Sequence, residues 1–182
     1  IEDLRACIDK VKRDIGPIRV LANNAGNDDR HATADVTVEY WDDRMAVNLR
    51  HQFFAAQAVR PQMRDAGGGS IINFGSITWL VGDPDCPAYV TAKAAVTGLT
   101  RALARELGPE RIRVNCMLPG WVMTERQMKL WLTPEGERQI DDRQCLKDRL
   151  RPDDIARMAL FLAADDSSMC SSQQFIVDGG WV

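Results

Sequence analysis

A tyrosine and a lysine stand four positions apart in the segment Tyr89-Val90-Thr91-Ala92-Lys93. On a helix, this spacing places both side chains on one face. A free tyrosine has a pKa of about 10 and is a weak base at neutral pH, but a fixed cation nearby favours the phenolate and lowers that pKa. The pair therefore indicates a device for proton transfer. Because surface helices carry the same spacing by chance, the interpretation depends on the surrounding sequence.

A serine lies at the end of the predicted strand that precedes this pair. The short apolar run Ser70-Ile71-Ile72-Asn73-Phe74-Gly75-Ser76 predicts a buried parallel strand that ends at Ser76. Open α/β sheets bind ligands beyond the carboxyl ends of their strands, so Ser76 is placed where chemistry would occur. The loop 77–88 contains one glycine and two prolines, and it can fold back to bring Tyr89 close to Ser76.

The order and spacing of several motifs resemble the short-chain dehydrogenase/reductase family over nearly the whole chain. The segments that carry the resemblance are Asn23-Asn24-Ala25-Gly26, Val47-Asn48-Leu49, Ser76 with Tyr89 and Lys93, Pro119-Gly120-Trp121-Val122-Met123-Thr124 and Asp178-Gly179-Gly180. A single motif of this kind arises by coincidence, whereas the complete ordered set is very hard to obtain that way. The resemblance implies an oxidoreductase that uses NAD or NADP, with the catalytic residues Asn48, Ser76, Tyr89 and Lys93.

The resemblance also implies a role for each of these residues. Tyr89 would take the proton of an alcohol during oxidation and return it during reduction. Lys93 would lower the pKa of Tyr89 and bind the ribose of the nicotinamide, and Ser76 would hold the substrate oxygen. Asn48 would position a water molecule that links Lys93 to solvent.

Cofactor contacts are implied for two further segments. Besides Tyr89 and Lys93, the implied contacts are Asn24, Ala25, Gly26, Pro119, Gly120, Val122 and Thr124. Thr124 and the backbone around Val122 would orient the carboxamide of the nicotinamide. Asn23 would instead stabilise neighbouring strands.

Several of these residues also have a purely structural interpretation. Taken alone, Asn48 is explained as a packing residue, Ser76 as a turn residue and Thr124 as a helix cap. Pro119-Gly120 is common where strands end. It is the whole set, at matching intervals, that favours the functional interpretation.

Strands alternate with helices along the chain and predict an α/β fold. The expected elements are a helix over 1–15 ended by Gly16-Pro17, a strand over 18–22, a helix from Thr37 to Val59 disturbed at Pro61, the strand ending at Ser76, a helix over 88–107, a strand over 112–118, irregular to helical structure over 121–150, a helix from Pro152 through Leu162 and a strand over 174–177. This alternation predicts a Rossmann-like, doubly wound parallel sheet with right-handed crossovers, in one domain over residues 1–182.

The first strands of the resembled fold are missing from this sequence. In the family, three strands and a glycine-rich dinucleotide turn precede the strand at 18–22. Gly67-Gly68-Gly69 is no substitute, because it precedes a strand instead of opening a helix. We therefore expect a partial dinucleotide-binding domain, N-terminally truncated from a longer dehydrogenase. The alternative is a catalytically dead remnant or interaction module, and a measurement of cofactor binding would separate the two.

Composition excludes several other classes. The chain has 182 residues, 45% of them hydrophobic, and a net charge of −3 without any basic block that would favour nucleic acid or a membrane surface. Five scattered cysteines form no C-x-x-C pair, so neither a disulfide framework nor a metal site is predicted and a reducing cytoplasm is expected. His31 and His51 show no ligand spacing, and surface or packing roles are expected for them.

The substrate is indicated by finer resemblances to bacterial sugar 1-dehydrogenases, the D-xylose group in particular. They include Asn27-Asp28-Asp29-Arg30-His31, Thr133-Pro134-Glu135-Gly136-Glu137 and Gln144-Cys145-Leu146-Lys147. A polyol needs many polar partners, and aromatic rings can stack on a sugar face. The candidate contacts are Asn27, Asp28, Gln127, Gln144, Trp79, Trp121 and Trp131, for which solvated loops and core packing are the plainer explanations.

Two further expectations follow from the resemblance. An aldose would lose hydride from C1 and give the lactone, although a 3-oxoacyl thioester, a steroid or a small ketone are alternative substrates within the family. A homodimer or homotetramer is implied, in which the helices that contain Asn48 and Tyr89 pack against their symmetry mates.

Overall fold

Four strands form one parallel sheet, and their order in the sheet is their order in the chain. The computed structural model describes residues 1–182 and places these strands at β1 (Val20–Asn23), β2 (Gly69–Phe74), β3 (Ile112–Pro119) and β4 (Gln174–Val177). The two central strands are apolar and almost wholly buried, as expected for strands covered on both faces. The predicted Rossmann-like parallel sheet is confirmed.

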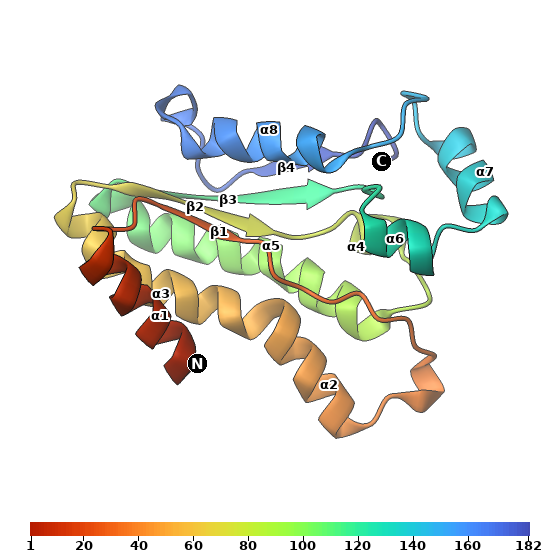
Figure 1. The fold of residues 1–182 in the computed structure, drawn as a ribbon, viewed down its shortest axis with the longest axis horizontal. Coiled ribbons are helices and arrows are strands. Elements are labelled where there is room, and N and C mark those ends of the chain that lie inside the picture. Colours follow the sequence, from red (N-terminus) through yellow and green to blue (C-terminus); the bar gives the residue numbers. More distant parts are fainter.

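Helices cover both faces of this sheet (Figure 1). On one face lie α3 (His51–Asp65) and α5 (Pro87–Leu107), and α1 (Glu2–Asp14) packs on the outside of α3. The other face is covered by α8 (Pro152–Ala163). The larger apolar core lies between the sheet and α3 and α5, and a second core forms under α8 around Ile72, Met117 and Leu162.

The long helix predicted from Thr37 is interrupted in a different place from the one expected. Thr37 does cap α2 (Val38–Met45), since its hydroxyl oxygen accepts a hydrogen bond from the Tyr40 N–H at 3.2 Å. The interruption is one turn of π-helix at Ala46–Arg50, before α3 begins. The predicted disturbance at Pro61 is wrong. The helix α3 continues through Pro61 to Asp65, and Pro61 stands on its exposed side.

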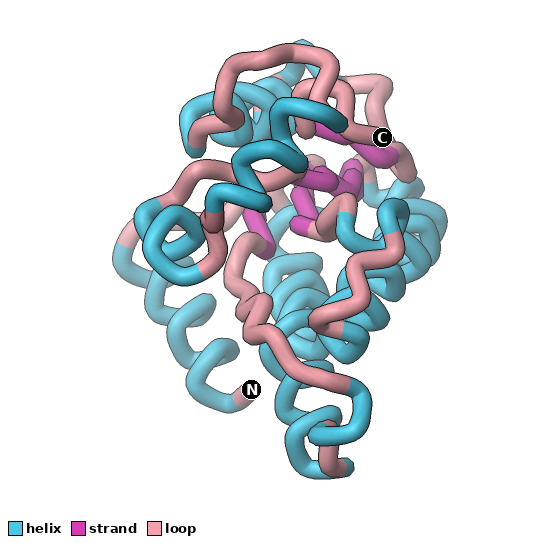
Figure 2. The backbone as a smooth tube through the Cα atoms, turned by 90° about the vertical axis from the view of Figure 1, so that its right-hand side faces the viewer, coloured by secondary structure: helices cyan, strands magenta, loops and turns pink.

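The short elements gather at the carboxyl edge of the sheet. They are α4 (Thr78–Val81), α6 (Glu125–Leu130) and α7 (Pro134–Arg143). Elsewhere in the chain, single turns of 3₁₀-helix lie at Thr33–Asp35, Gly108–Glu110 and Asp165–Ser167. Figure 2 looks onto this edge and shows loops and short helices around the strand ends. None of the helices combines the length and the apolar character needed to cross a bilayer.

Candidate active site

A cavity of about 1640 Å³ lies beyond the carboxyl ends of the strands. It is lined by nine of the eleven residues to which the sequence gives catalytic or cofactor roles, namely Asn24, Gly26, Ser76, Tyr89, Lys93, Pro119, Gly120, Val122 and Thr124. Ala25 and Asn48 do not line it. The residues come from the segments that follow β1 and β2, from α5, and from the end of β3 and the segment after it, so the sheet edge brings together groups that are distant in sequence.

Ser76 and Tyr89 meet inside this cavity. Ser76 follows β2, and its hydroxyl oxygen accepts a hydrogen bond from the Thr78 N–H at 3.2 Å, which fixes the turn into α4. Tyr89 lies in the first turn of α5. Burial raises the pKa of Tyr89, and the nearby Ser76 hydroxyl opposes this change by interacting with the phenol.

Lys93 lies one helical turn beyond Tyr89 and is buried. Its Nζ atom donates a hydrogen bond to the carbonyl oxygen of Phe74 at 2.8 Å and lies 5.5 Å from the centre of the Tyr89 ring. Burial lowers the pKa of Lys93 to about 8. The helix therefore places a titratable amine against the side of the phenol, at the end of β2.

The structure corrects one electrostatic expectation. The sequence predicts that a cation four positions away lowers the pKa of Tyr89, but that pKa is raised because loss of water outweighs every favourable contact. The cationic contribution that lowers it comes from Arg30 and is small. The buried phenol therefore keeps its proton at neutral pH in this environment.

Asn48 fixes the loop after β1, which forms part of the cavity wall. Its Oδ1 atom accepts from the Asn27 N–H at 2.8 Å, and its Nδ2 atom donates to the carbonyl oxygens of Asn27 and Arg44, each at 3.0 Å. A Cβ atom on Gly26 would lie 3.1 Å from Oδ1 of Asn48 and 3.2 Å from Nζ of Lys93. The π-helical turn thus supplies the amide that fixes the loop after Gly26, with Lys93 on the other side of that glycine.

Asn23 links the strands, as the sequence suggested. Its Nδ2 atom donates to Oδ1 of Asn73 on β2 at 2.8 Å, and Nδ2 of Asn73 donates in turn to the Thr100 hydroxyl of α5 at 3.0 Å. This buried chain of hydrogen bonds joins β1, β2 and α5. It fixes α5 relative to the strand ends.

The segment after β3 is shaped by two close contacts. A Cβ atom on Gly120 would lie 2.7 Å from Cβ of Asp178, so only glycine lets the ends of β3 and β4 come this near. The Thr124 hydroxyl oxygen accepts from the Gln127 N–H at 3.2 Å and caps α6. Thr124 therefore serves as a helix cap and also lines the cavity.

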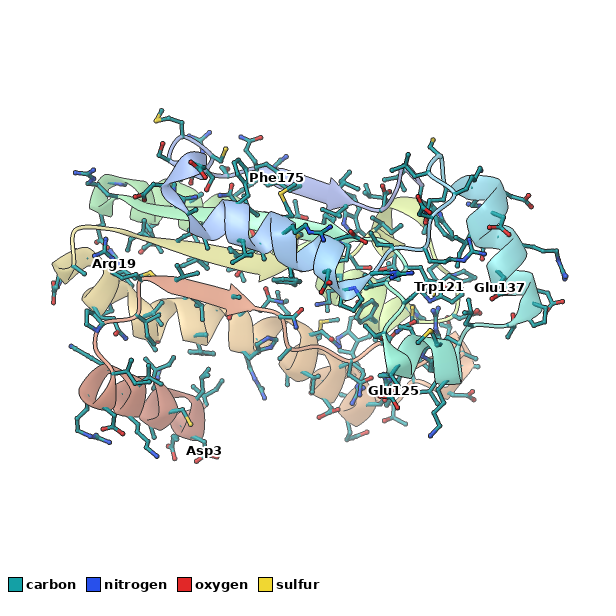
Figure 3. All side chains as sticks on the ribbon, turned by 45° about the horizontal axis from the view of Figure 1, so that its top comes forward. Asp3, Arg19, Trp121, Glu125, Glu137 and Phe175 are labelled. Carbon is teal, nitrogen blue, oxygen red and sulfur yellow. The ribbon has the colours of Figure 1, made fainter.

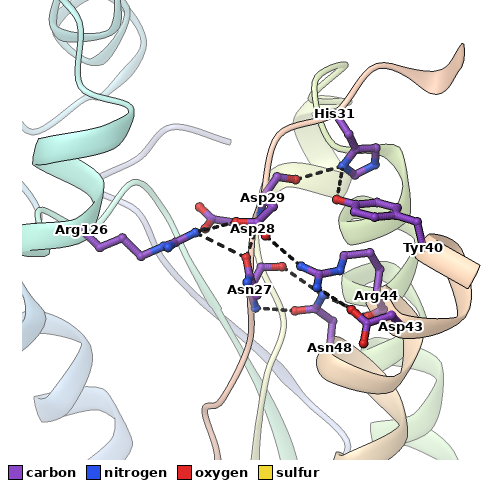
Figure 4. A network of polar contacts seen from close by, with 9 residues as sticks. All are labelled: Asn27, Asp28, Asp29, His31, Tyr40, Asp43, Arg44, Asn48 and Arg126. Atoms are coloured by element: carbon purple, nitrogen blue, oxygen red, sulfur yellow. Dashed lines mark hydrogen bonds and ion pairs between the residues drawn. The ribbon is translucent and has the colours of Figure 1, made fainter. Parts of the chain in front are cut away.

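The loop after Asn24-Ala25-Gly26 is held from both sides (Figure 4). Asp29 pairs with Arg44 of α2 at 3.1 Å and with Arg126 of α6 at 2.9 Å. Asp28 accepts hydrogen bonds from Gln127 and Arg126. These contacts place α6 against the loop across the mouth of the cavity.

The candidate sugar contacts divide into two groups. Asn27, Asp28, Gln127, Trp121 and Trp131 line the cavity, whereas Trp79 and Gln144 do not. Figure 3 shows Trp121, Glu125 and Glu137 at this end of the molecule, far from Arg19 and Asp3.

The two outliers have structural explanations. Trp79 packs against the buried cluster around Ile77 and Val96. The Gln144 side chain is buried and donates to the carbonyl oxygens of Leu146 and Asp148, which fixes its own turn. The prediction that these two residues contact a sugar is therefore wrong.

Several cavity residues are not among the site residues expected from the sequence. A surface or packing role is expected for His31, but it lies in the cavity wall, and Arg30, Asp83 and Trp181 line the cavity as well. Arg30 pairs with Asp83 at 2.8 Å and lies over the ring of Trp131. These partners are about fifty or more positions apart, so no local spacing could reveal them.

Comparison with known proteins finds relatives that are named as dehydrogenases. Residues 1–182 match a family model described as enoyl-(acyl carrier protein) reductase. Over 174 residues the chain is 57% identical to D-xylose 1-dehydrogenase of Caulobacter vibrioides, covering 96% of this chain and 70% of that protein. Over 180 residues it is 52% identical to a protein named "Probable galactose dehydrogenase" from Rhizobium meliloti, covering 99% of this chain and 70% of the other.

A solved structure extends the likeness to three dimensions. Gluconate 5-dehydrogenase from Burkholderia cenocepacia, in complex with NADP and tartrate, superposes with a TM-score of 0.92 at 30% sequence identity. The match covers 99% of this chain and 71% of that chain. The chain spans about 70% of the length of these relatives.

Proposed function

The chain belongs to the short-chain dehydrogenase/reductase family, and from this premise we propose that it oxidises an aldose at C1 to the lactone with NAD or NADP. The observation that carries the proposal is the cavity that Ser76, Tyr89 and Lys93 share, with the buried amine against the phenol ring. Two relatives at 57% and 52% identity are named as sugar dehydrogenases, which favours a sugar over a thioester or a steroid. The description of the family model names another reaction, and fold alone does not fix the substrate.

The residues around Gly26 fit the nicotinamide half of the cofactor. The missing side chain leaves room beside Nζ of Lys93, and an ammonium with a phenol is a donor set suited to ribose hydroxyls. Asn24, Pro119, Gly120, Val122 and Thr124 would complete the contacts. When bound, the oxidised nicotinamide would supply a hydride acceptor and a positive charge.

Proton transfer would be carried out by the chain itself. The Ser76 hydroxyl would donate a hydrogen bond to the oxygen on C1 of the sugar, and Tyr89 in its phenolate form would accept the proton of that oxygen. Because burial raises the pKa of Tyr89, the phenolate needs positive charge nearby. The Lys93 ammonium, 5.5 Å from the centre of the ring, would supply it. Asn48 would act by fixing Asn27 and with it the wall of the cavity.

The sugar would be held by polar groups at the mouth of the cavity. Asn27, Asp28 and Gln127 offer both acceptors and donors, as buried hydroxyl groups require. Trp121 and Trp131 are the rings available for stacking on the sugar face.

A substrate panel tests this proposal. The protein carrying this chain is mixed with D-xylose, D-galactose, a 3-oxoacyl thioester or a steroid, each with NAD or NADP, and the absorbance of the reduced nicotinamide is followed. We expect turnover with one or both aldoses and a lactone as product. Turnover confined to the thioester or the steroid would refute sugar oxidation. No turnover with any of these compounds would favour the alternative of a catalytically inactive chain.

Gly26→Ala is expected to lower kcat about 10-fold with little change in folding. The new methyl group must displace the Lys93 amine or the Asn48 amide by a few tenths of an ångström, and small misplacements at reacting groups are costly to rate. Steady-state kinetics would show the loss. Gly98→Ala is the matched control, because a Cβ atom at that helical site meets nothing within 4 Å, and it should leave kcat unchanged. Equal kcat values for Gly26→Ala and Gly98→Ala would contradict the close approach of Gly26 to Lys93 and Asn48.

We also propose a homodimer or homotetramer in a reducing, cytoplasmic setting. Exposed apolar side chains such as Phe53 on α3 and Leu160 on α8 support assembly, and five free thiols support the reducing environment. Sedimentation equilibrium would give the number of copies.

A further inference from the structure

The first turn of α5 has no cap of its own. The side chain of Cys86, which precedes the helix, makes no capping hydrogen bond, and Pro87 at the first position has no N–H. The first N–H that needs a partner is that of Ala88, a residue that is completely buried. It donates a hydrogen bond to Nε2 of His31 at 3.3 Å. A side chain from the loop after β1 therefore does what a capping serine or aspartate does elsewhere.

The partners of His31 require a single tautomer. An N–H group can only donate, so the contact with Ala88 requires an unprotonated Nε2. On the other side of the ring, Nδ1 lies 3.0 Å from the carbonyl oxygen of Asp29, which can only accept, so Nδ1 carries the proton. The Tyr40 hydroxyl, also 3.0 Å from Nδ1, fits this arrangement as an acceptor (Figure 4).

Further contacts near His31 also join the loop after β1 to the segment before α5. The His31 N–H donates to the carbonyl oxygen of Asp85 at 2.8 Å, and Arg30 pairs with Asp83 at 2.8 Å. The loop after β1 is thus joined to the segment that leads into α5 at two consecutive positions, Arg30 and His31. His31 is the one that reaches the helix itself, next to Tyr89.

We propose that His31 is a positioning residue for Tyr89: by accepting the Ala88 N–H, it fixes the first turn of α5 and hence the place of the phenol in the cavity. The proposal rests on the function proposed for Tyr89. His31 itself transfers no proton to or from the substrate, since both of its ring nitrogens are engaged by other groups. Removing the His31 acceptor for the Ala88 N–H should lower kcat without weakening substrate binding.

Two substitutions separate the two ring nitrogens. The side-chain amide that His31→Gln introduces can reach the place of Nε2 with its oxygen, whereas the shorter side chain of His31→Asn can reach only that of Nδ1. We expect His31→Asn to lower kcat about 10-fold, with the KM for sugar and for cofactor changed less than about 2-fold. We expect His31→Gln to keep kcat within about 3-fold of the original. Tyr40→Phe, which removes a partner of Nδ1 alone, should have no effect on kcat.

Amide hydrogen exchange makes the test independent of activity. The Ala88 N–H should exchange about 10-fold or more faster in His31→Asn than in the original protein or in His31→Gln. Unchanged kcat in His31→Asn, or a loss in His31→Gln as large as that in His31→Asn, would overturn the proposal while leaving the oxidoreductase function intact. If the original protein has no turnover, the proposed function fails, and uniform exchange at Ala88 in all variants would then overturn the helix-positioning role as well.

Nitrogen NMR of the unsubstituted protein needs no variant. The resonances of the His31 ring should show a protonated Nδ1 and an unprotonated Nε2. A protonated Nε2 at neutral pH would show that Ala88 has no acceptor there, and it would overturn the proposal even if a variant failed to fold.

Discussion

Tyr89→Phe should lower kcat by about 10²- to 10⁴-fold, the range that a positioned acid or base usually contributes. The substitution removes one oxygen atom and leaves the ring, which packs beside the Lys93 amine at 5.5 Å. Binding of cofactor and sugar should change by less than about 3-fold, because most of the cavity wall stays in place. Steady-state kinetics and cofactor titration would measure both quantities.

The other tyrosine of the chain provides the control. Tyr40→Phe removes a hydroxyl that lies outside the cavity wall, and it should retain the original kcat. If Tyr89→Phe also kept its turnover to within a few-fold, Tyr89 would not be the proton carrier, and the mechanism proposed above would be wrong.

Lys93→Met should lower turnover and at the same time stabilise the fold. Removing the amine removes the positive charge next to Tyr89, for which we expect a loss in kcat of about 10²-fold. Burial lowers the pKa of Lys93 from 10.5 to about 8, so the charged amine is disfavoured in the folded state. A shift of this size corresponds to roughly 3 kcal/mol at neutral pH. The carbonyl oxygen of Phe74 keeps a second donor in Gln52, at 3.4 Å.

The pH dependence of unfolding gives the sign of this effect. Between pH 8 and 10.5 the unfolded chain holds the Lys93 proton and the folded chain does not, so the contribution of Lys93 to the free energy of unfolding rises with pH across this window. Below pH 8 the amine is charged in both states and its burial is fully unfavourable. Urea unfolding should therefore show Lys93→Met more stable than the original protein at about pH 7, with the difference shrinking as the pH approaches 10.5. A less stable variant at neutral pH would contradict the burial of a charged amine.

The local part of the site could be predicted from the sequence. Tyr89 and Lys93 share a helix face because of their spacing, and Ser76 follows an apolar run that predicts a buried strand. Asn23 is correctly assigned to strand pairing. It ends β1, and its side-chain amide bonds Asn73 on the neighbouring strand β2. These inferences need only periodicity and the rule that ligands bind at the carboxyl ends of parallel strands.

The parts that failed depend on distant partners. Gln144 lies in a segment that has the composition of a polar loop, and its burial results from the docking of the chain end against it, with the Cys145 and Leu146 N–H groups bonded to Gly180 and Gly179. Trp79 could face either a sugar or the core, and the cluster around Val96 decides for the core. The raised pKa of Tyr89 reflects burial by the whole fold, which a four-residue spacing does not encode.

The interruption of the long helix shows the same limit. Proline marks a possible break in any sequence, whereas the π-helical turn at Ala46–Arg50 has no such mark. Within this turn the Asn48 side chain bonds both backbone groups of Asn27, a tertiary contact that local sequence does not mark.

Transfer of deuterium from the sugar to the nicotinamide tests the account most directly. The protein carrying this chain is incubated with D-xylose or D-galactose labelled with deuterium at C1, together with NAD or NADP, and the reduced nicotinamide is examined by mass spectrometry. We expect one deuterium on the reduced cofactor and a lactone without the label. Reduced nicotinamide without deuterium, or labelled sugar left unchanged under conditions in which another alcohol is oxidised, would contradict it.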